Sequence, residues 1–224
     1  MNYPKEWQVH LSKGERIAAV LRLNIINGEM DQHRLITENQ IADRFKVSRS
    51  PVRDAFKILS QERLIRLERM GAEIIPFNEE KRQELSDIRL MIEAFAFTKI
   101  VERNDIDMII KNMLQSLEIM RVSVQFEDAT RFTTEDLRFH EVMVEACEHS
   151  YLMHIWQQMK PIMLCLIYIS MKERMETNRS DFERILDNHQ QFIEAIKAKD
   201  RHQMYEAFKA NFNDINNNIG AFWS

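Results

Sequence analysis

The sequence predicts a mostly α-helical protein in two parts, a small N-terminal module over residues 1–78 and an antiparallel helical bundle over residues 79–224. Three of the four glycines and three of the four prolines precede residue 77. The remainder has almost no helix breakers, which favours long helices. Residues 1–78 carry 13 Lys and Arg against 10 Asp and Glu, whereas residues 79–224 carry 18 against 25. A basic module joined to an acidic bundle indicates that only the first part meets a polyanion.

The first two elements of the module are predicted helices. An apolar stripe from Ile17 to Ile25 has helical spacing and ends at Gly28, a residue that commonly terminates helices. The segment TENQIADRF begins with Thr37, and Gln40 follows three residues later. This spacing matches a capping box, in which the two side chains bond each other's backbone N–H groups.

A third helix and a β-hairpin complete the module. The helix is predicted to restart in VSRSPVRDAF, where Ser48 or Ser50 can cap it. Pro51 suits the first turn because the N–H groups of that turn have no helical partner. The segment LIRLERMGAEII alternates apolar and charged residues on either side of Met70 and Gly71, which predicts a small hairpin. Helix, helix, turn, helix and hairpin together make a winged helix-turn-helix.

Positive charge gathers on the third helix and the hairpin. From residue 44 to residue 69 there are eight basic residues and three acidic ones. Arg49 and Arg53 are four residues apart, so they project from one face of the helix start, where a recognition helix meets base edges. Arg66 and Arg69 lie where a wing would touch phosphate or the minor groove. The usual alternative for a charge run is a solvated helix face, but the order of the elements favours DNA binding.

The second part is predicted to hold six helices. The most apolar of them is expected to lie at the centre of the bundle, because its residues are apolar nearly all round. The most apolar helix spans roughly 150–175. The six predicted ranges are roughly 79–103, 105–124, 127–147, 150–175, 180–198 and 200–218.

Neither the apolar runs nor the cysteines indicate export or a membrane. The most apolar run, Ile162 to Ile169, is far shorter than the roughly 20 residues that span a bilayer. The N-terminal segment MNYPKEWQVH lacks the apolar core of a signal peptide. Cys147 and Cys165 do not make a disulfide framework. We therefore expect a soluble, cytoplasmic protein without a membrane partner.

The bundle contains a candidate metal site. Asp136 and His140 are four residues apart and share a helical face, and His189 belongs to another helix. One carboxylate and two imidazoles match a two-histidine, one-carboxylate site with open positions. The alternative is an Asp–His pair that stabilises a helix surface.

Long stretches of the chain resemble a known family. TENQIADRFKVSRSPVRDAFKILSQERLI resembles the DNA-binding module of GntR-type bacterial transcription regulators. DIRLMIEAFAFTKI, DLRFHEVMVEACEHSYL and NHQQFIEAIKAKDRHQMYEAFKANF resemble the all-helical effector domain, or FCD domain, of its FadR-like subfamily. The resemblance covers about residues 12 to 216. It implies a homodimer, binding to operator DNA, and a small carboxylate effector.

The resemblance assigns DNA contacts residue by residue. The base- and phosphate-contacting positions of the family fall on Ser48, Arg49, Ser50 and Arg53, with wing contacts near Gly71. The chain departs from the family pattern in several places, and the usual Pro-Gly before the second helix is replaced by DQHRL. A family arginine of the second helix is Asn39, and a glycine after the recognition helix is Arg63, which must then adopt a left-handed backbone.

The resemblance also implies a divalent metal such as zinc or nickel in the bundle. The family ligands, one aspartate and three histidines, fall on Asp136, His140, His189 and position 211. Position 211 is Asn211, whose amide oxygen is a poorer ligand for these metals than imidazole. The site either keeps a weaker three-ligand metal or holds the effector by hydrogen bonds alone.

Arg89 matches a family arginine near the effector pocket. It can pair with an effector carboxylate bidentately, or with Glu93 four residues later in its own helix. The expected effector-binding residues are therefore Arg89, Asp136, His140, His189 and Asn211.

The leading interpretation, which rests mainly on the resemblance, is a repressor that a small carboxylate, gluconate or a related sugar acid, releases from its operator. A pocket of imidazoles, carboxylate, amide and guanidinium suits a polyhydroxy acid, whereas a long acyl chain would need an apolar cavity. One alternative is a metal-dependent enzyme that uses the two histidines and the aspartate. Another is an architectural DNA-binding protein that responds to no effector.

Overall fold

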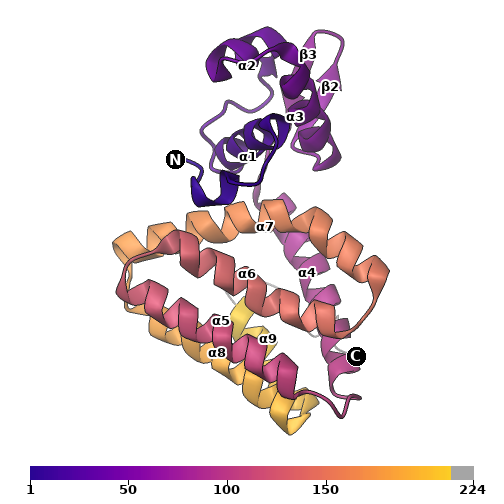
Figure 1. Ribbon diagram of the computed structural model, residues 1–224, viewed down its shortest axis with the longest axis vertical. Coiled ribbons are helices and arrows are strands. Elements are labelled where there is room, and N and C mark those ends of the chain that lie inside the picture. Colours follow the sequence, from indigo (N-terminus) through magenta and orange to yellow (C-terminus); the bar gives the residue numbers. More distant parts are fainter. Residues whose placement is uncertain (213–224) are drawn as a thin grey trace. The chain divides into compact units, whose positions relative to one another are not determined.

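The computed structural model describes residues 1–212 and divides into two compact units between Glu79 and Glu80 (Figure 1). The N-terminal unit holds a short 3-10 helix, three α-helices and one three-stranded sheet. Their bounds are η1 Glu6–Gln8, α1 Lys13–Ile26, β1 Leu35–Ile36, α2 Glu38–Phe45, α3 Arg49–Gln61, β2 Ile65–Glu68 and β3 Gly71–Ile74. This order confirms the predicted winged helix-turn-helix.

The sheet has the strand order β1-β3-β2, and both pairings are antiparallel. The predicted hairpin is present, with Ile65 opposite Ile74 and Glu68 opposite Gly71. Strand β1 was not predicted. It has only two residues, too few to show the alternation that identifies a strand.

Local chemistry sets the helix boundaries of this unit. The capping box at Thr37 and Gln40 is present in full. Ser48 occupies the predicted N-cap position of α3. Its side chain makes no cap hydrogen bond within the described chain, so the expected capping interaction is wrong. Arg63 has a φ of 56°, which confirms the left-handed backbone expected there.

Helix α3 is held against α1 so that its other face is exposed. Leu59 of α3 and Leu21 of α1 are fully buried. Arg22 of α1 donates from Nε to Glu62 at the end of α3 over 2.7 Å, and both side chains are largely buried. Burial strengthens this pair because little water competes for the charges. Arg53 consequently lies on the solvent side of α3.

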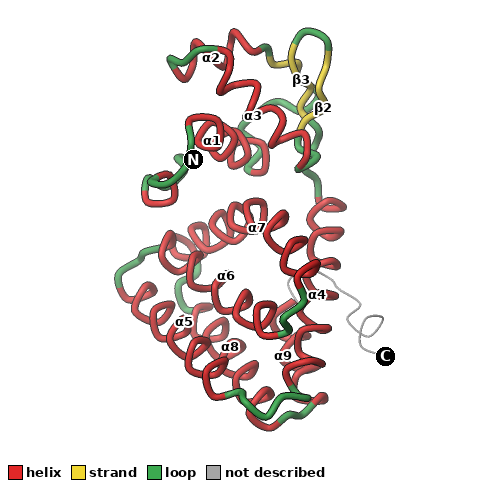
Figure 2. The backbone as a smooth tube through the Cα atoms, turned by 45° about the vertical axis from the view of Figure 1, so that its right-hand side comes forward, coloured by secondary structure: helices red, strands yellow, loops and turns green. Residues whose placement is uncertain are grey.

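The second unit is a helical bundle (Figures 1 and 2). Its helices are α4 Glu79–Ile100, α5 Asp107–Gln125, α6 Ala129–Ala146, α7 Ser150–Thr177, α8 Asp181–Ala198 and α9 Arg201–Phe212. The part of the predicted last helix beyond residue 212 lies outside the described residues. Across residues 1–212, no helix combines the length and the apolar character that crossing a membrane requires.

The central helix is α6, not α7 as the apolar pattern predicted. Figure 1 shows α6 between α7 and α5. Ten of the 18 residues of α6 are buried, against six of the 28 in α7. Composition misled the prediction, because α6 buries polar residues such as Asp136 and His140 together with its apolar ones. The position of α6 places those polar side chains in the core.

We expect Gly71→Ala to destabilise the N-terminal unit more than Gly28→Ala. Gly71 has a φ of +147°, and an added Cβ would lie 2.1 Å from the Ile36 carbonyl oxygen. Strained backbone of this kind costs about 1–3 kcal/mol before the clash is added. Gly28, at φ +70°, has open space around an added Cβ. Gly28→Ala should therefore lower the free energy of unfolding by only about 1 kcal/mol. Urea unfolding of both variants measures the difference, and equal losses would contradict the packing of β1 on β3.

Candidate functional site

A groove in the N-terminal unit brings basic side chains of α3 and the hairpin together. The groove encloses about 490 Å³ and lies between α2, the exposed face of α3 and the hairpin turn. Its polar and charged lining residues are Thr37, Glu38, Asn39, Arg49, Arg53, Lys57, Glu68 and Arg69, and Gly71 lies at its edge. Four of the positions expected to contact DNA, those of Arg49, Arg53, Arg69 and Gly71, therefore share one groove.

The arginines of this groove differ in their pairing. Arg53 is oriented by Glu38, whose two carboxylate oxygens lie 2.8 and 2.9 Å from its Nε. Arg49 and Arg69 make no hydrogen bond or ion pair with other residues of the described chain. Their charges are consequently available to an anionic ligand.

The other expected DNA contacts lie elsewhere. Ser48 and Ser50 line a second groove together with Lys13 and Lys46. Arg66 lines neither groove. It pairs with Glu68 over 2.9 Å and also with Glu73, so its charge is already balanced. The fold itself requires a glycine at position 71, because β1 approaches too closely for a Cβ atom.

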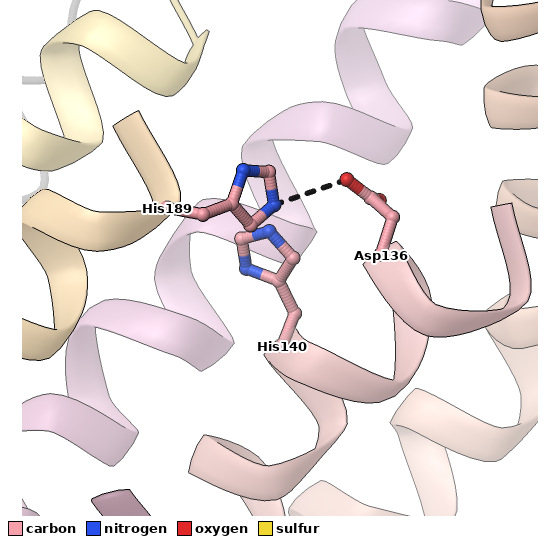
Figure 3. A group of neighbouring side chains, drawn as sticks. All are labelled: Asp136, His140 and His189. Atoms are coloured by element: carbon pink, nitrogen blue, oxygen red, sulfur yellow. Dashed lines mark ion pairs between the residues drawn. The ribbon is translucent and has the colours of Figure 1, made fainter. Parts of the chain in front are cut away.

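In the helical unit, Asp136, His140 and His189 meet in the core (Figure 3). The first two lie on α6 and the third on α8, and all three side chains are buried. One ligand atom from each lies within 4.8 Å of the other two. The Nε2 atom of His189 lies 3.1 Å from the Oδ1 atom of Asp136.

Both imidazoles are held through Nδ1. His140 Nδ1 lies 2.6 Å from the carboxylate of Glu93, and His189 Nδ1 lies 2.7 Å from the carbonyl oxygen of Ile185. Because both partners can only accept, each Nδ1 must carry the proton. When its ring is neutral, each Nε2 presents a lone pair. Within residues 1–212 the Nε2 of His140 has no hydrogen-bond partner, and that of His189 has only the 3.1 Å contact with Asp136.

This arrangement fits a cation. A neutral His189 sets its Nε2 lone pair against the Asp136 carboxylate at 3.1 Å, which is repulsive unless a proton or a metal ion lies between them. Metal-bound histidines commonly have the other ring nitrogen fixed by a carboxylate or a carbonyl, as here. Zinc binds imidazole nitrogen and carboxylate oxygen at about 2.0–2.2 Å, so small inward movements would let the three share one ion.

The electrostatics of the cluster favour the protonation states in which its side chains can bind a metal. Burial raises the pKa of Asp136, but the hydrogen bond and charge of His189 in its protonated form outweigh it and lower the pKa to about 2. Burial lowers the pKa of His140, against the opposing effect of Glu93. An ionised carboxylate and a neutral imidazole are the forms that bind metal.

Sequence reasoning missed the role of Glu93. Arg89 donates from Nε to Glu93 over 2.6 Å, so the predicted pair within α4 is made. The same carboxylate also holds His140, and its side chain is fully buried rather than exposed. One of the two terminal nitrogens of Arg89, Nη2, is buried without a hydrogen-bond partner in the described structure. Arg89 therefore keeps a further N–H donor after it has paired with Glu93.

Asn211 lies in the last turn of α9, half-buried. The residue before it, Ala210, accepts a hydrogen bond from Asn188, the neighbour of His189. The residue after it, Phe212, has its ring 5.2 Å from the guanidinium carbon of Arg89. These two contacts hold the end of α9 beside α8 and Arg89.

Aromatic rings enclose the histidines. The ring of Phe139 meets His189 edge to face at 4.8 Å between centroids, and Phe192 meets His140 at 5.5 Å. With both imidazoles neutral, Glu93 and Asp136 contribute two negative charges and Arg89 one positive charge. The cluster thus has a net charge of −1 in a surrounding of low polarity, where charge is felt strongly.

Comparison with known proteins identifies both units. Residues 13–74 match the model described as bacterial regulatory proteins, gntR family, and residues 84–214 match the FCD domain. The chain is 43% identical over 221 residues to the gluconate operon transcriptional repressor of Bacillus subtilis, covering 99% of this chain and 90% of that protein. It is 42% identical to the repressor of the same name from Bacillus licheniformis, with the same coverage.

Solved structures share the fold. E. coli McbR/YncC superposes with a TM-score of 0.66 at 18% identity, over 92% of this chain and 97% of that one. A protein described as Lar, which controls expression of the Listeria monocytogenes agr system, also has a TM-score of 0.66, at 17% identity. This match covers 92% of the present chain and 95% of the Listeria protein chain. The relatives are regulators rather than enzymes, and the chain belongs to the gntR family of bacterial regulatory proteins, with an FCD domain as its helical unit.

Proposed function

We propose that this protein is a transcriptional repressor that gluconate or a related sugar acid releases from its operator. The observation that carries the proposal is the 43% identity, over nearly the whole chain, to a gluconate operon transcriptional repressor. The N-terminal unit binds operator DNA, and the helical unit binds the effector.

In the N-terminal unit, Arg49 and Arg53 read base edges from the start of α3. Both project into the groove beside the hairpin, and Arg49 has no competing partner in the described chain. Arg69 and the backbone at Gly71 contact the DNA from the wing. Ser48 and Ser50, with the lysines of the second groove, hold the phosphate backbone. Phosphate contacts fix the position of the module, whereas base contacts give specificity.

In the helical unit, Asp136, His140 and His189 hold a divalent metal such as zinc or nickel, with Asn211 as a weaker fourth ligand. The orphaned Nε2 atoms support this, since the cluster places two lone pairs and a carboxylate around one point. A divalent ion changes the net charge of the cluster from −1 to +1. When bound, the metal supplies positive charge that a carboxylate effector can meet.

Further buried donors suit a polyhydroxy acid. The free Nη2 of Arg89 can bind an effector carboxylate while its Nε remains on Glu93. Thr133 lies three residues before Asp136 and seven before His140, on the same face of α6. Its hydroxyl is buried without a hydrogen-bond partner in residues 1–212, so it can bind an effector hydroxyl. A long acyl chain would leave these groups unsatisfied.

Release requires only modest coupling between the two activities. Two copies of the chain bind the two halves of a palindromic operator, with half-sites about 34 Å apart or less. The effector must bind the protein form that cannot bind DNA more tightly than the DNA-binding form. A difference of about 1–3 kcal/mol in binding free energy weakens operator binding about 5- to 150-fold.

Operator release tests the proposal directly. DNA selected from random sequence by the purified protein is labelled, and the complex is titrated with gluconate, lactate and a fatty acyl thioester. We expect gluconate to dissociate the complex and the other two to leave it intact. Release by lactate or the thioester alone would reject the assigned effector. Binding that no acid alters would favour an architectural protein.

Arg49→Ala should abolish preference for the selected operator without unfolding the protein. Arg49 is exposed, and the variant loses no core packing. A bidentate contact to a base gives about 1–3 kcal/mol of discrimination. Arg131→Ala, which removes an exposed arginine of the helical unit, serves as the control and should bind as wild type. Competition between operator and unrelated DNA measures the effect, and unchanged preference in Arg49→Ala would reject the groove as the reading face.

Asn211→His should raise the metal affinity of the cluster, and His189→Ala should lower it. An added imidazole replaces a weak amide oxygen, whereas the alanine removes a ligand that the core already positions. Metal content is measured by mass spectrometry after dialysis against graded chelator, with circular dichroism as the folding control. Negligible metal in both wild type and Asn211→His would leave the cluster as a hydrogen-bonding site.

A further inference from the structure

The start of α2 forms one wall of the groove that holds Arg49 and Arg53. Thr37, Glu38 and Asn39, which are the N-cap residue and the first two residues of α2, all line this groove. Asn39 is exposed, and its side-chain amide makes no hydrogen bond with other residues of the described chain. This wall of the groove therefore presents a polar group that the fold itself does not use.

The neighbours of Asn39 in the sequence all have structural partners. Thr37 accepts from the backbone N–H of Gln40, and the Gln40 side chain accepts from the backbone N–H of Thr37, which starts the helix. Glu38 binds Arg53. Asn39 takes part in neither contact, and asparagine is a weaker helix former than arginine, glutamine or glutamate. The stability of α2 therefore gives no reason for an asparagine at this position.

Unpaired acceptors are scarce among the side chains of the groove. Its cationic side chains can only donate hydrogen bonds. Glu38 and Glu68 each pair with an arginine, and the Thr37 hydroxyl accepts the capping bond. Among the oxygen-bearing side chains that line the groove, that of Asn39 is the one without a partner within residues 1–212. Its amide also carries an N–H donor beside the acceptor oxygen.

A donor beside an acceptor matches the edge of adenine in the major groove. Adenine presents its N6 amino group as a donor and N7 as an acceptor, and one asparagine amide can bond to both. Guanine presents two acceptors, O6 and N7, which suit an arginine. The amide oxygen of asparagine would meet another acceptor there, which is repulsive. An asparagine in this groove therefore favours adenine and disfavours guanine.

Glu38 places this amide close to Arg53. Its two carboxylate oxygens lie 2.8 and 2.9 Å from Nε of Arg53, so both terminal nitrogens of the guanidinium remain available for a guanine. Consecutive α-carbons of a chain are about 3.8 Å apart, and stacked bases of one strand are about 3.4 Å apart. Because Asn39 directly follows Glu38, the bases that meet Asn39 and Arg53 are close neighbours within one half-site.

We propose that Asn39 is a specificity-determining residue, which reads an adenine beside the guanine that Arg53 reads. The amide oxygen of Asn39 accepts from N6 of the adenine, and the amide N–H donates to N7. Glu38 acts as a positioning residue, because it holds Arg53 next to this amide. The inference rests on the proposed function, since α3 must enter the major groove, and it deepens that function by naming a base pair of the operator and the residue that reads it.

Selection of bound sequences from random DNA tests the assignment. Wild type should select an A·T pair at one position of each half-site, and a G·C pair there should weaken binding about 5- to 150-fold. Asn39→Arg should select a G·C pair at that position, because arginine offers donors only. Asn39→Ala should lose the preference at that position and keep it at the others. Asn104→Arg adds the same charge at an exposed residue between α4 and α5, and this control should select the wild-type sequence.

A modified base tests the contact at a single atom. In 7-deazaadenine a C–H group replaces N7, so the base loses one acceptor but keeps its amino group and its pairing with thymine. Placed at the assigned position, it should weaken binding of wild type about 2- to 12-fold, the loss expected for one hydrogen bond. Binding of Asn39→Ala should not change, because this variant has no amide to donate to N7.

Two results would overturn the inference. One is an Asn39→Arg variant that selects the wild-type sequence, and the other is an equal loss of binding by wild type and Asn39→Ala on the modified DNA. Either result would leave the repressor assignment in place, provided that gluconate still releases wild type from its operator. A wild type that selects no sequence at all would reject both the inference and the proposed function.

Discussion

The buried carboxylate of Glu93 is the interaction on which the candidate effector site depends. It accepts from Nδ1 of His140 at 2.6 Å and from Nε of Arg89 at 2.6 Å, so one side chain links α4 to α6. The first contact fixes the tautomer of His140 and turns its Nε2 toward Asp136 and His189. The second leaves Nη2 of Arg89 as a buried donor. A fully buried carboxylate is tolerated here because both of its oxygens are bound.

Charge explains why such a cluster can respond to a ligand. Two carboxylates, one guanidinium and two neutral imidazoles leave a net negative charge among aromatic rings, which is unfavourable without a cation. In the proposed function, a divalent metal would reverse the sign, and an anionic effector would then restore neutrality. Each ligand would thereby prepare the site for the next. The central position of α6 carries both Asp136 and His140 into the core.

The sequence predicted what depends on local chemistry. The capping box at Thr37, the hairpin around Met70 and Gly71, and the left-handed backbone at Arg63 each follow from a few neighbouring residues. It could not predict what depends on packing between distant segments. The short strand β1, the burial of Glu93 and the central position of α6 are of this kind. Sequence spacing suggested that Asp136, His140 and His189 could meet, and the partners that orient them emerged only from the fold.

Calorimetric titration of gluconate into wild type and Glu93→Gln tests the central claim most directly. The amide keeps the size of the side chain but loses the charge and one of the two acceptor oxygens, so it can no longer accept from both Arg89 and His140. We predict at least about tenfold weaker gluconate binding, the loss expected for a hydrogen bond between charged groups. Glu102→Gln, at a 63% exposed glutamate just beyond α4, should bind gluconate as wild type does. Equal affinity in Glu93→Gln and wild type would contradict the account.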